Sequence, residues 1–272
     1  MKKIKIVLII GVSLLVISVA FLLYPTIANL VNSIFNSSTI SNYSENANTL
    51  SEQAVNDEFR AESEYNKEIS ERVSVSYATK ASISGYDDIL NFDGVIGYIT
   101  IPEIDVNLPI YHGSDENVLT KGAAHLPNTS FPIGGVGNHA VLSAHTGYPN
   151  QVFFDDLPKL KSGDLIYVSV LNRQMTYTVD EINIVEPDDI RLLQIDDDRD
   201  LISLVTCYPY GINSHRLIVT AERAVVEAPN NKLPEVESDN YSFIVVIFTV
   251  LLLLASLIFT VIKVRKGRED NA

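Results

Sequence analysis

Two long apolar segments lie near the ends of the chain. Ile6 to Leu23 is apolar apart from two serines, and Phe243 to Ile262 is interrupted by two threonines and one serine. A helix that spans a bilayer needs about 20 such residues. Lysines precede the first segment, and lysines and arginines follow the second. By the positive-inside rule, this arrangement predicts two spanning helices, both termini in the cytoplasm and residues 24–241 outside the cell.

A cleaved signal peptide is the alternative interpretation of the first segment. The small-x-small pattern of a cleavage site is not evident before Tyr24-Pro25, which favours an uncleaved anchor. The second segment is too long and too apolar for an ordinary core helix, so it predicts a membrane span without a comparable alternative.

Leu50 to Val73 has the spacing of an amphipathic helix. Apolar residues such as Val55 and Phe59 recur four positions apart, and acidic residues fill many of the positions between them. Such a helix places one apolar face on a core and leaves the other face in solvent. The following stretch, Ser74 to Asp88, has little periodicity and is interpreted as a loop.

From Gly94 onward, short β-prone runs alternate with turns that contain glycine and proline. Several short strands at this spacing predict a closed or nearly closed β-barrel. The expected strands are Val95–Ile101, Ile104–Tyr111, His139–Ala144, Leu165–Leu171, Met175–Val185, Leu201–Thr206 and Leu217–Ala221. Short helical turns are expected at Ser114–Thr120 and Val152–Leu157. The predicted order is an N-terminal anchor (1–24), a helical extension (25–93), a barrel (94–228), a linker (229–241), a second span (242–262) and a basic tail (263–272).

Composition argues against several classes of protein. A net charge of -14 argues against nucleic-acid binding, because phosphate neutralisation requires clustered Lys and Arg. The single cysteine, Cys207, forbids an intrachain disulfide and Cys-x-x-Cys chemistry. His139 and His145 would be about 20 Å apart on one strand, and the histidines form no tight cluster with the cysteine, so we expect no metal site.

Cys207 follows the apolar run Leu201 to Thr206, and Pro209 and Gly211 break the chain shortly after it. Arg216 opens the next β-prone run. This order of strand, turn and strand would bring the Arg216 guanidinium back beside the sulfur. A nearby cation favours the thiolate, which is the reactive form of cysteine. The alternative is that a lone cysteine acts as a small buried hydrophobic residue.

His145 is the best candidate partner for the thiol. It ends an apolar run and leads into a loop, a position at which catalytic residues are often presented. His215 adjoins Arg216, and neighbours in a strand point to opposite faces, so only one of these two can approach Cys207. A histidine such as His145 is more often a hydrogen-bonding residue than a catalyst, but its combination with a strand-end cysteine and a nearby arginine favours chemistry.

Several stretches resemble the sortase family. Leu204-Val205-Thr206-Cys207 resembles the sortase signature Thr-Leu-x-Thr-Cys, with Arg216 at the position of the signature's downstream arginine. Ala144-His145-Thr146-Gly147 is similar to the sortase histidine region, and Leu108–Gly113 and Gly122–Leu126 also resemble that family. The resemblance covers about residues 94–222. It implies an eight-stranded sortase β-barrel and a cysteine transpeptidase. Together with the hydropathy patterns above, the predicted fold is mainly β: a closed eight-stranded sortase β-barrel with an N-terminal helical extension and two flanking transmembrane helices.

Other features resemble class C, the pilus-assembling sortases of Gram-positive bacteria. These are the two anchors, the helical extension with Ala61 to Asn66, and the stretch Cys207 to Gly211. One departure is Ser203, which replaces the first Thr of the signature but retains a hydroxyl group.

A second departure concerns the lid that class C enzymes place over the cleft with an Asp-Pro-aromatic motif. No proline occurs between Pro25 and Pro102, so this motif is absent. The corresponding segment is Val73 to Asp88, in which Tyr77 and Tyr86 are the candidates for filling the cleft.

The resemblance also implies the roles of the site residues. The Cys207 thiolate attacks the Thr carbonyl of an LPxTG-like sorting signal, Arg216 donates to the oxyanion, and His145 acts as general acid and then as general base. A pilin lysine resolves the thioester to an isopeptide bond, and no cofactor takes part. The expected partners are pilin or other surface-protein precursors at the cell membrane.

Two alternatives stay open. A housekeeping-type sortase would share the first half of the reaction and attach surface proteins to cell-wall peptide. A non-catalytic, membrane-anchored β-domain would bind a partner and keep Cys207 buried and inert. The reactivity of Cys207 towards a thiol reagent distinguishes this second alternative from an enzyme.

Overall fold

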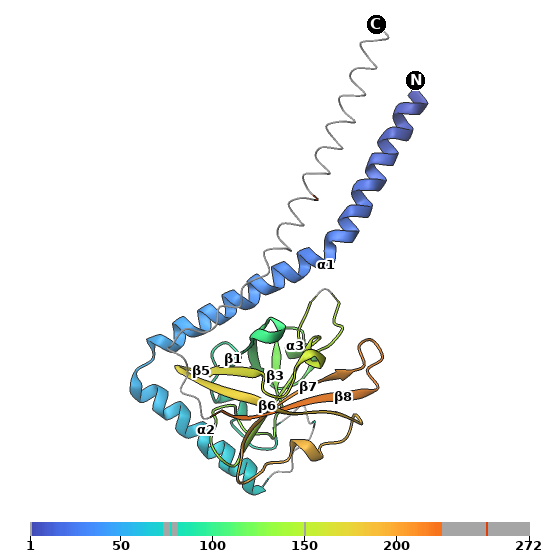
Figure 1. The fold of residues 1–272 in the computed structure, drawn as a ribbon. Helices are drawn as coiled ribbons and strands as arrows, with labels where there is room; N and C mark the ends of the chain where they lie inside the picture. Colours follow the sequence, from blue (N-terminus) through green and yellow to red (C-terminus); the bar gives the residue numbers. More distant parts are fainter. Residues whose placement is uncertain (1, 73–76, 78–80, 150, 225–248, 250–272) are drawn as a thin grey trace. The chain divides into compact units, whose positions relative to one another are not determined.

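The computed structural model describes residues 2–72, 77, 81–149, 151–224 and 249 (Figure 1). Contacts divide the chain into two units, of which one contains residues 1–33 and the other contains residues 34–148 and the strands that follow. The predicted linker and basic tail lie outside the described residues, and so does the second predicted span apart from Thr249. The prediction of two spanning helices therefore stays a prediction.

The N-terminal helix α1 runs from Lys2 to Thr49 and contains Pro25. The sequence predicted an anchor over residues 1–24 and a separate helical extension over 25–93, whereas in the structure one helix continues from the anchor through Pro25 to Thr49. Proline removes one backbone donor, but here it does not end the helix. Among the described residues, one helical stretch, Ile10 to Thr49, is long and apolar enough to cross a membrane, and it fits an anchor or a signal sequence.

The second helix, α2 (Glu52–Arg72), is the amphipathic helix that the sequence predicted. Its apolar residues, including Phe59 and Ile69, are buried in the main core. The Asn66 side chain forms two hydrogen bonds with the backbone of Phe131, accepting from N–H at 2.6 Å and donating to C=O at 3.2 Å. α2 is thereby fixed to the chain segment that precedes strand β4.

The eight strands close into a barrel with the order β1-β2-β3-β4-β7-β8-β6-β5. The β2–β3 and β4–β7 pairs are parallel, and the other neighbouring pairs are antiparallel. The closed barrel is confirmed. The strands are β1 (Val95–Ile101), β2 (Val106–His112), β3 (Ala123–His125), β4 (Asn138–Ser143), β5 (Leu165–Val170), β6 (Arg173–Val185), β7 (Asp200–Tyr208) and β8 (His215–Arg223).

Seven of these strands lie close to their predicted bounds, but β3 was not predicted. It has three residues, too few for an alternating pattern to stand out. The expected turn at Ser114–Thr120 contains helix α3 (Glu116–Leu119), whereas no helix forms over residues 152–156. Short 3-10 helices occupy Tyr86–Asp88, Pro102–Ile104, Leu157–Lys159 and Arg191–Leu193.

The strands β4, β7 and β8 have two different faces. Residues such as Leu142, Leu204 and Val219 contribute to the main core. Their neighbours Val141, Val205 and Ile218 belong to a second, smaller apolar cluster. This alternation follows from the period of two in a strand. The second face carries the candidate site.

Candidate active site

Cys207 and Arg216 face each other across β7 and β8. The register pairs Cys207 with Arg216 and Tyr208 with His215. Opposite residues of an antiparallel pair project from the same face, with Cβ atoms about 4.5–5.5 Å apart. Arg216 rather than His215 therefore shares a face with the thiol, which is free and partly buried.

The turn between β7 and β8 holds Arg216 in place through backbone contacts. The carbonyl of Pro209 accepts hydrogen bonds from the N–H groups of Ile212 (3.0 Å) and Asn213 (2.9 Å). The guanidinium of Arg216 donates to the carbonyl of His215 at 3.1 Å. Within the described part of the chain, Arg216 forms no ion pair with a carboxylate, so its charge stays available to an anionic group at the sulfur.

His145 lies two positions beyond β4, next to β7. The parallel register of the two strands pairs Ser143 with Val205. The contact continues past β4, because Ala144 N–H donates to the carbonyl of Val205 (3.2 Å) and the Thr206 hydroxyl donates to the carbonyl of Ala144 (2.7 Å). Continued by one step, this register sets His145 level with Cys207. The three predicted site residues thus meet at one end of β4, β7 and β8.

The site residues are near one another but not bonded to one another. No hydrogen bond or ion pair among the described residues joins the side chains of His145, Cys207 and Arg216.

The ring of His145 is held by stacking. It lies parallel to the Tyr148 ring, with centroids 5.0 Å apart and planes 15° apart. The Asp155 carboxylate accepts from the N–H groups of Gly147 (2.8 Å) and Phe153 (3.0 Å), which closes the loop after His145. Gly147 has φ 69°, and a Cβ there would lie 3.4 Å from the Tyr210 ring, so glycine suits this close approach.

A patch of five apolar side chains, which we call the apolar strip, lies on the same face as Cys207. Val205 and Ile218 lie opposite each other two residues along the strands from the Cys207–Arg216 pair, and are the next pair on the same face. Tyr77 packs against the strip, and its hydroxyl group is buried without a hydrogen-bond partner. Burial raises the pKa of Tyr77, and the nearby charge of Arg216 opposes this rise. The strip consists of Leu126, Val141, Leu193, Val205 and Ile218.

Tyr86, the other predicted candidate for filling the cleft, occupies a different place. It is buried, and its hydroxyl group lies 2.9 Å from Nδ1 of His125 and accepts from the N–H of Gly113 at the same distance. Its ring stacks near Phe131. Of the two tyrosines, Tyr77 is the one that lies beside Arg216.

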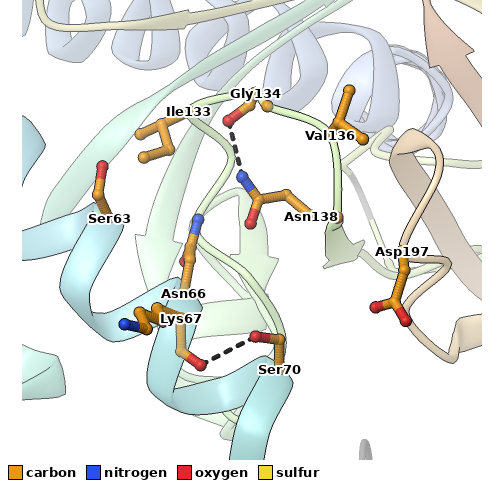
Figure 2. A pocket seen from close by; sticks show the side chains of 11 residues that line it. Ser63, Asn66, Lys67, Ser70, Ile133, Gly134, Val136, Asn138 and Asp197 are labelled. Atoms are coloured by element: carbon orange, nitrogen blue, oxygen red, sulfur yellow. Dashed lines mark hydrogen bonds between the residues drawn. The ribbon is translucent and has the colours of Figure 1, made fainter.

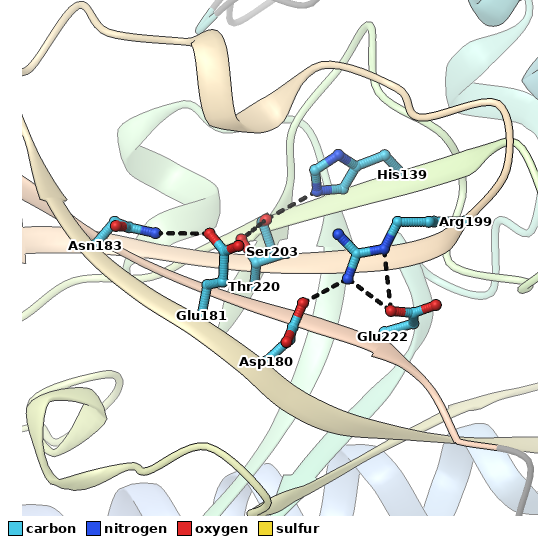
Figure 3. A network of polar contacts seen from close by, with 8 residues as sticks. All are labelled: His139, Asp180, Glu181, Asn183, Arg199, Ser203, Thr220 and Glu222. Atoms are coloured by element: carbon cyan, nitrogen blue, oxygen red, sulfur yellow. Dashed lines mark hydrogen bonds and ion pairs between the residues drawn. The ribbon is translucent and has the colours of Figure 1, made fainter.

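His139 anchors a separate polar network on the same strands (Figure 3). Nδ1 lies 2.8 Å from the carbonyl of Gln194, which can only accept, so Nδ1 carries the proton. Nε2 then accepts from the Ser203 hydroxyl (2.8 Å), and that oxygen accepts from Thr220 (3.0 Å). Burial lowers the pKa of His139, so the ring stays neutral. The hydroxyl that Ser203 retains from the signature is thus a structural contact.

A pocket of about 400 Å³ lies between α2 and the glycine-rich loop that follows Ile133 (Figure 2). Lys67 and Ser70 line it from the helix, Val136 lines it from the loop, and Asn138 lines it from the start of β4. None of the predicted site residues lines this pocket. No group of three or more His, Cys, Asp or Glu side chains that could hold a metal ion occurs among the described residues.

Sequence reasoning missed the residues that surround His145. Tyr148 lies three positions after it and could have been noticed as an aromatic residue within reach. Glu116, whose Oε1 lies 3.6 Å from Nε2 of His145, carries no signal in the sequence, because it comes from a different segment that only the folded barrel brings close.

The description of the matching family model is "Sortase domain", and the match covers residues 99–224. Among solved structures, sortase C1 from Streptococcus agalactiae superposes with a TM-score of 0.65 and 41% identity, over 70% of this chain and 100% of that one. Sortase C from Clostridium perfringens, solved with the C-terminal cell wall sorting motif, superposes with a TM-score of 0.62 and 40% identity, again over 70% and 100%.

Curated relatives match over a shorter stretch. Sortase A from Bacillus anthracis is 34% identical over 128 residues, which cover 47% of this chain and 59% of the relative. Sortase A from Streptococcus agalactiae is 33% identical over 132 residues, which cover 47% of this chain and 52% of the relative. The chain thus spans little more than half of the length of these two curated relatives.

Proposed function

This chain belongs to the sortase family, and we propose that it is a membrane-anchored cysteine transpeptidase that cleaves an LPxTG-like sorting signal between Thr and Gly. The observation that carries the proposal is the cross-strand pair of Cys207 and Arg216, with His145 beyond the end of the adjoining strand. The resemblance to sortases, which rested on short motifs in the sequence, is supported independently by the shared fold.

In the first half of the reaction, the Cys207 thiolate attacks the carbonyl carbon of the signal's threonine. The carbonyl π electrons move to oxygen and form a tetrahedral oxyanion. Arg216 lies on the same face as the sulfur and donates to this oxygen; its guanidinium keeps its proton throughout. Removal of one such donor typically costs about 3–4 kcal/mol of transition-state stabilisation.

His145 handles the protons of both halves. As imidazolium it protonates the departing glycine amine, and the C–N bond breaks to leave a thioester on Cys207. The neutral ring then takes a proton from the incoming amine, which attacks the thioester and releases the thiolate. A lysine of the next pilin subunit is the proposed amine, and the product is an isopeptide bond.

The apolar strip offers a surface for the Leu and Pro side chains of the signal. Its Val205–Ile218 pair lies two residues along the strands from the nucleophile, on the same face, and Tyr77 packs against it in this structure. Binding of the signal to the strip therefore requires displacement of Tyr77. Tyr77 would fill the place that an Asp-Pro-aromatic lid fills in class C enzymes.

A housekeeping activity is the second candidate function. The curated relatives from Bacillus anthracis and Streptococcus agalactiae are named Sortase A, whereas the solved structures with 40–41% identity are named sortase C. Attachment to cell-wall peptide would use the same Cys207 chemistry and a different amine. The helical extension formed by α1 and α2 supports the pilus-assembling proposal.

The test is mass spectrometry on the full chain in detergent micelles, incubated with an LPxTG-type peptide. We expect an acyl adduct on Cys207 that a pilin lysine resolves, and no adduct in Cys207→Ala. Resolution by a cell-wall amine alone would favour the housekeeping function. Tyr77→Ala, which uncovers the apolar strip, is tested in the same way. If neither the folded wild-type protein nor folded Tyr77→Ala forms an adduct, the transpeptidase proposal is contradicted.

The proposed topology places both termini in the cytoplasm of a Gram-positive cell and the barrel outside. The apolar, exposed N-terminal part of α1 supports one span, and the second span rests on the sequence. Reporter fusions at the C-terminus test it, because a cytoplasmic reporter should be active there and a secreted reporter should be inactive.

A further inference from the structure

Glu116 faces the ring of His145 from a neighbouring element. It opens α3, the short helix that follows β2, and the Asp115 side chain caps this helix by accepting from the N–H of Val118 at 3.2 Å. The Oε1 atom of Glu116 lies 3.6 Å from Nε2 of His145. The carboxylate is largely in solvent, with 73% of the side chain exposed, whereas the His145 side chain is 24% exposed.

The Nε2 atom of His145 is buried, and no hydrogen bond satisfies it. A buried ring nitrogen without a partner is unfavourable, because it has lost its hydrogen bond to water. The Glu116 carboxylate is a few tenths of an ångström too far for a hydrogen bond in the resting state. When the ring is protonated, the attraction between opposite charges favours closing this distance to a charge-assisted hydrogen bond.

We propose that Glu116 is a positioning residue for His145. Its carboxylate stabilises the imidazolium through Nε2 and leaves Nδ1 to exchange the proton with the substrate amine. The inference rests on the proposed role of His145 as acid and base. The Tyr148 ring, parallel to His145, fixes the plane of the ring, and the Glu116 carboxylate fixes its orientation within that plane.

Exposure limits the size of the effect. Ion pairs with an exposed partner contribute little, and the corresponding change in an equilibrium or a rate is about two- to fivefold. Other charged or titratable groups on the elements around the ring include Asp115, Tyr148, Asp155, Cys207 and Arg216. The Asp115 carboxylate accepts from the N–H of Val118, so it is engaged in capping α3. Asp155 is engaged by two backbone N–H groups, and Arg216 is a cation, so neither supplies the carboxylate that Nε2 lacks.

The experiment compares Glu116→Gln, Glu116→Asp and the control Glu103→Gln in the full chain in detergent micelles. Glu103 is an exposed acid in the 3-10 helix before β2, so its substitution changes the net charge equally without touching His145. NMR of isotope-labelled histidine follows the His145 ring as pH is varied, with His145→Gln to assign the signal. The rate of transfer from an LPxTG-type peptide to an amine is measured across the same pH range.

In Glu116→Gln, we expect the His145 ring to lose its proton about half a pH unit lower than in wild type, since the stabilising charge is gone. The alkaline limb of the rate profile should shift in the same direction, with kcat reduced about two- to fivefold and KM unchanged. Glu116→Asp should restore part of both effects, and Glu103→Gln should show neither.

An unchanged ring titration in Glu116→Gln would overturn the proposal, whatever the rate does. A fall in kcat with an equal fall in melting temperature and no pH shift would also overturn it, because that pattern marks a structural role. If wild type does not turn over the peptide but the ring titration shifts as expected, the contact with Glu116 stands and the proposed transpeptidase function fails.

Discussion

His139 and His145 come from the same stretch of chain and differ in what surrounds them. Both ring nitrogens of His139 have partners, Gln194 and Ser203, whereas the ring of His145 forms no hydrogen bond within the described residues. The difference agrees with the different roles proposed for the two residues. A histidine with both nitrogens occupied holds elements together, and a histidine with a free nitrogen can still accept or donate a proton.

The polar groups around the two histidines differ in the same way, since those near His139 are paired and those near His145 are not bonded to each other. Near His139, Arg199 is paired with Glu222 and Asp180, and Ser203 with Thr220, so polar groups are matched (Figure 3). At the other end of β7, the Cys207 thiol and the Arg216 guanidinium face each other without a direct bond. The paired polar groups link neighbouring strands, and the end of β7 that carries Cys207 is where we propose that substrate binds.

The first prediction substitutes each histidine with alanine. His145→Ala should lower the transfer rate by about 10²–10⁴-fold, the usual range for a general acid or base, with little change in melting temperature. His139→Ala should destabilise the fold by about 1–3 kcal/mol, because it leaves the Gln194 carbonyl and the Ser203 hydroxyl unpaired. Thermal unfolding and single-turnover kinetics measure the two effects. An equal loss of stability in both variants would remove the distinction between the histidines.

The second prediction concerns the neighbours Arg216 and His215. Arg216→Ala should lower kcat by about 10²–10³-fold, since one donor to the oxyanion is lost. His215→Ala, which changes the residue on the opposite face of β8, should leave kcat within about twofold of wild type, because surface substitutions have small effects. Steady-state kinetics on an LPxTG-type peptide measure both. A comparable loss in His215→Ala would mean that the register does not define the site.

The third prediction tests whether an unpaired polar group always marks chemistry. Glu62 on α2 is fully buried, and neither carboxylate oxygen has a hydrogen-bond partner. Burial raises its pKa to about 9, with a further rise from Glu58. Because the folded state holds a proton that the unfolded state releases above about pH 4.5, folding loses stability as pH rises from there towards 9.

Glu62→Gln removes this dependence, since the amide does not titrate. It should stabilise the fold by about 2–3 kcal/mol at pH 7 and have almost no effect near pH 4.5. Its rate of peptide cleavage should equal that of wild type. Urea unfolding at the two pH values measures the stability, and the exposed Glu64→Gln on the same helix is the matched control. A pH-independent difference between Glu62→Gln and wild type would contradict the assigned cause.

The fourth and smallest effect is expected at Tyr77. Its buried hydroxyl has no partner where it covers the apolar strip, and such a group costs about 1–3 kcal/mol. Tyr77→Phe removes that cost, so the ring should pack more stably on the apolar strip. Because the peptide must displace this ring, KM for the peptide should rise at least about fivefold. Tyr77→Ala should lower KM. Opposite signs distinguish a covering residue from a substrate-binding one, for which both substitutions would raise KM.

The sequence was sufficient for the parts of the site that depend on local order. The sequence predicted a strand, a turn and a strand here, from the apolar run before Cys207, the breaks at Pro209 and Gly211, and the β-prone run from Arg216. The structure pairs Cys207 with Arg216 accordingly. Successive side chains in a strand point to opposite faces, and this likewise places Arg216 and His215 on different faces of β8. Both inferences need only the geometry of neighbouring strands.

What the sequence could not provide depends on contacts between distant segments. The three-residue β3, which pairs with β2 and β4, is too short for a pattern to show in the sequence. Neither the partners of His139 nor the approach of Glu116 to His145 follows from spacing, because each contact joins elements that become neighbours only when the barrel closes.

The parallel pairing of β4 with β7 also bears on the order of folding. It joins residues 62 positions apart, so the chain must close a long loop before His145 comes near Cys207. Such non-local pairings form late, because the entropy of loop closure is lost before their contacts are gained. The Cys207–Arg216 pair belongs to the local hairpin of β7 and β8, whereas His145 joins it only when β4 pairs with β7. A partly folded chain therefore brings two of the three proposed site residues together before the barrel is complete.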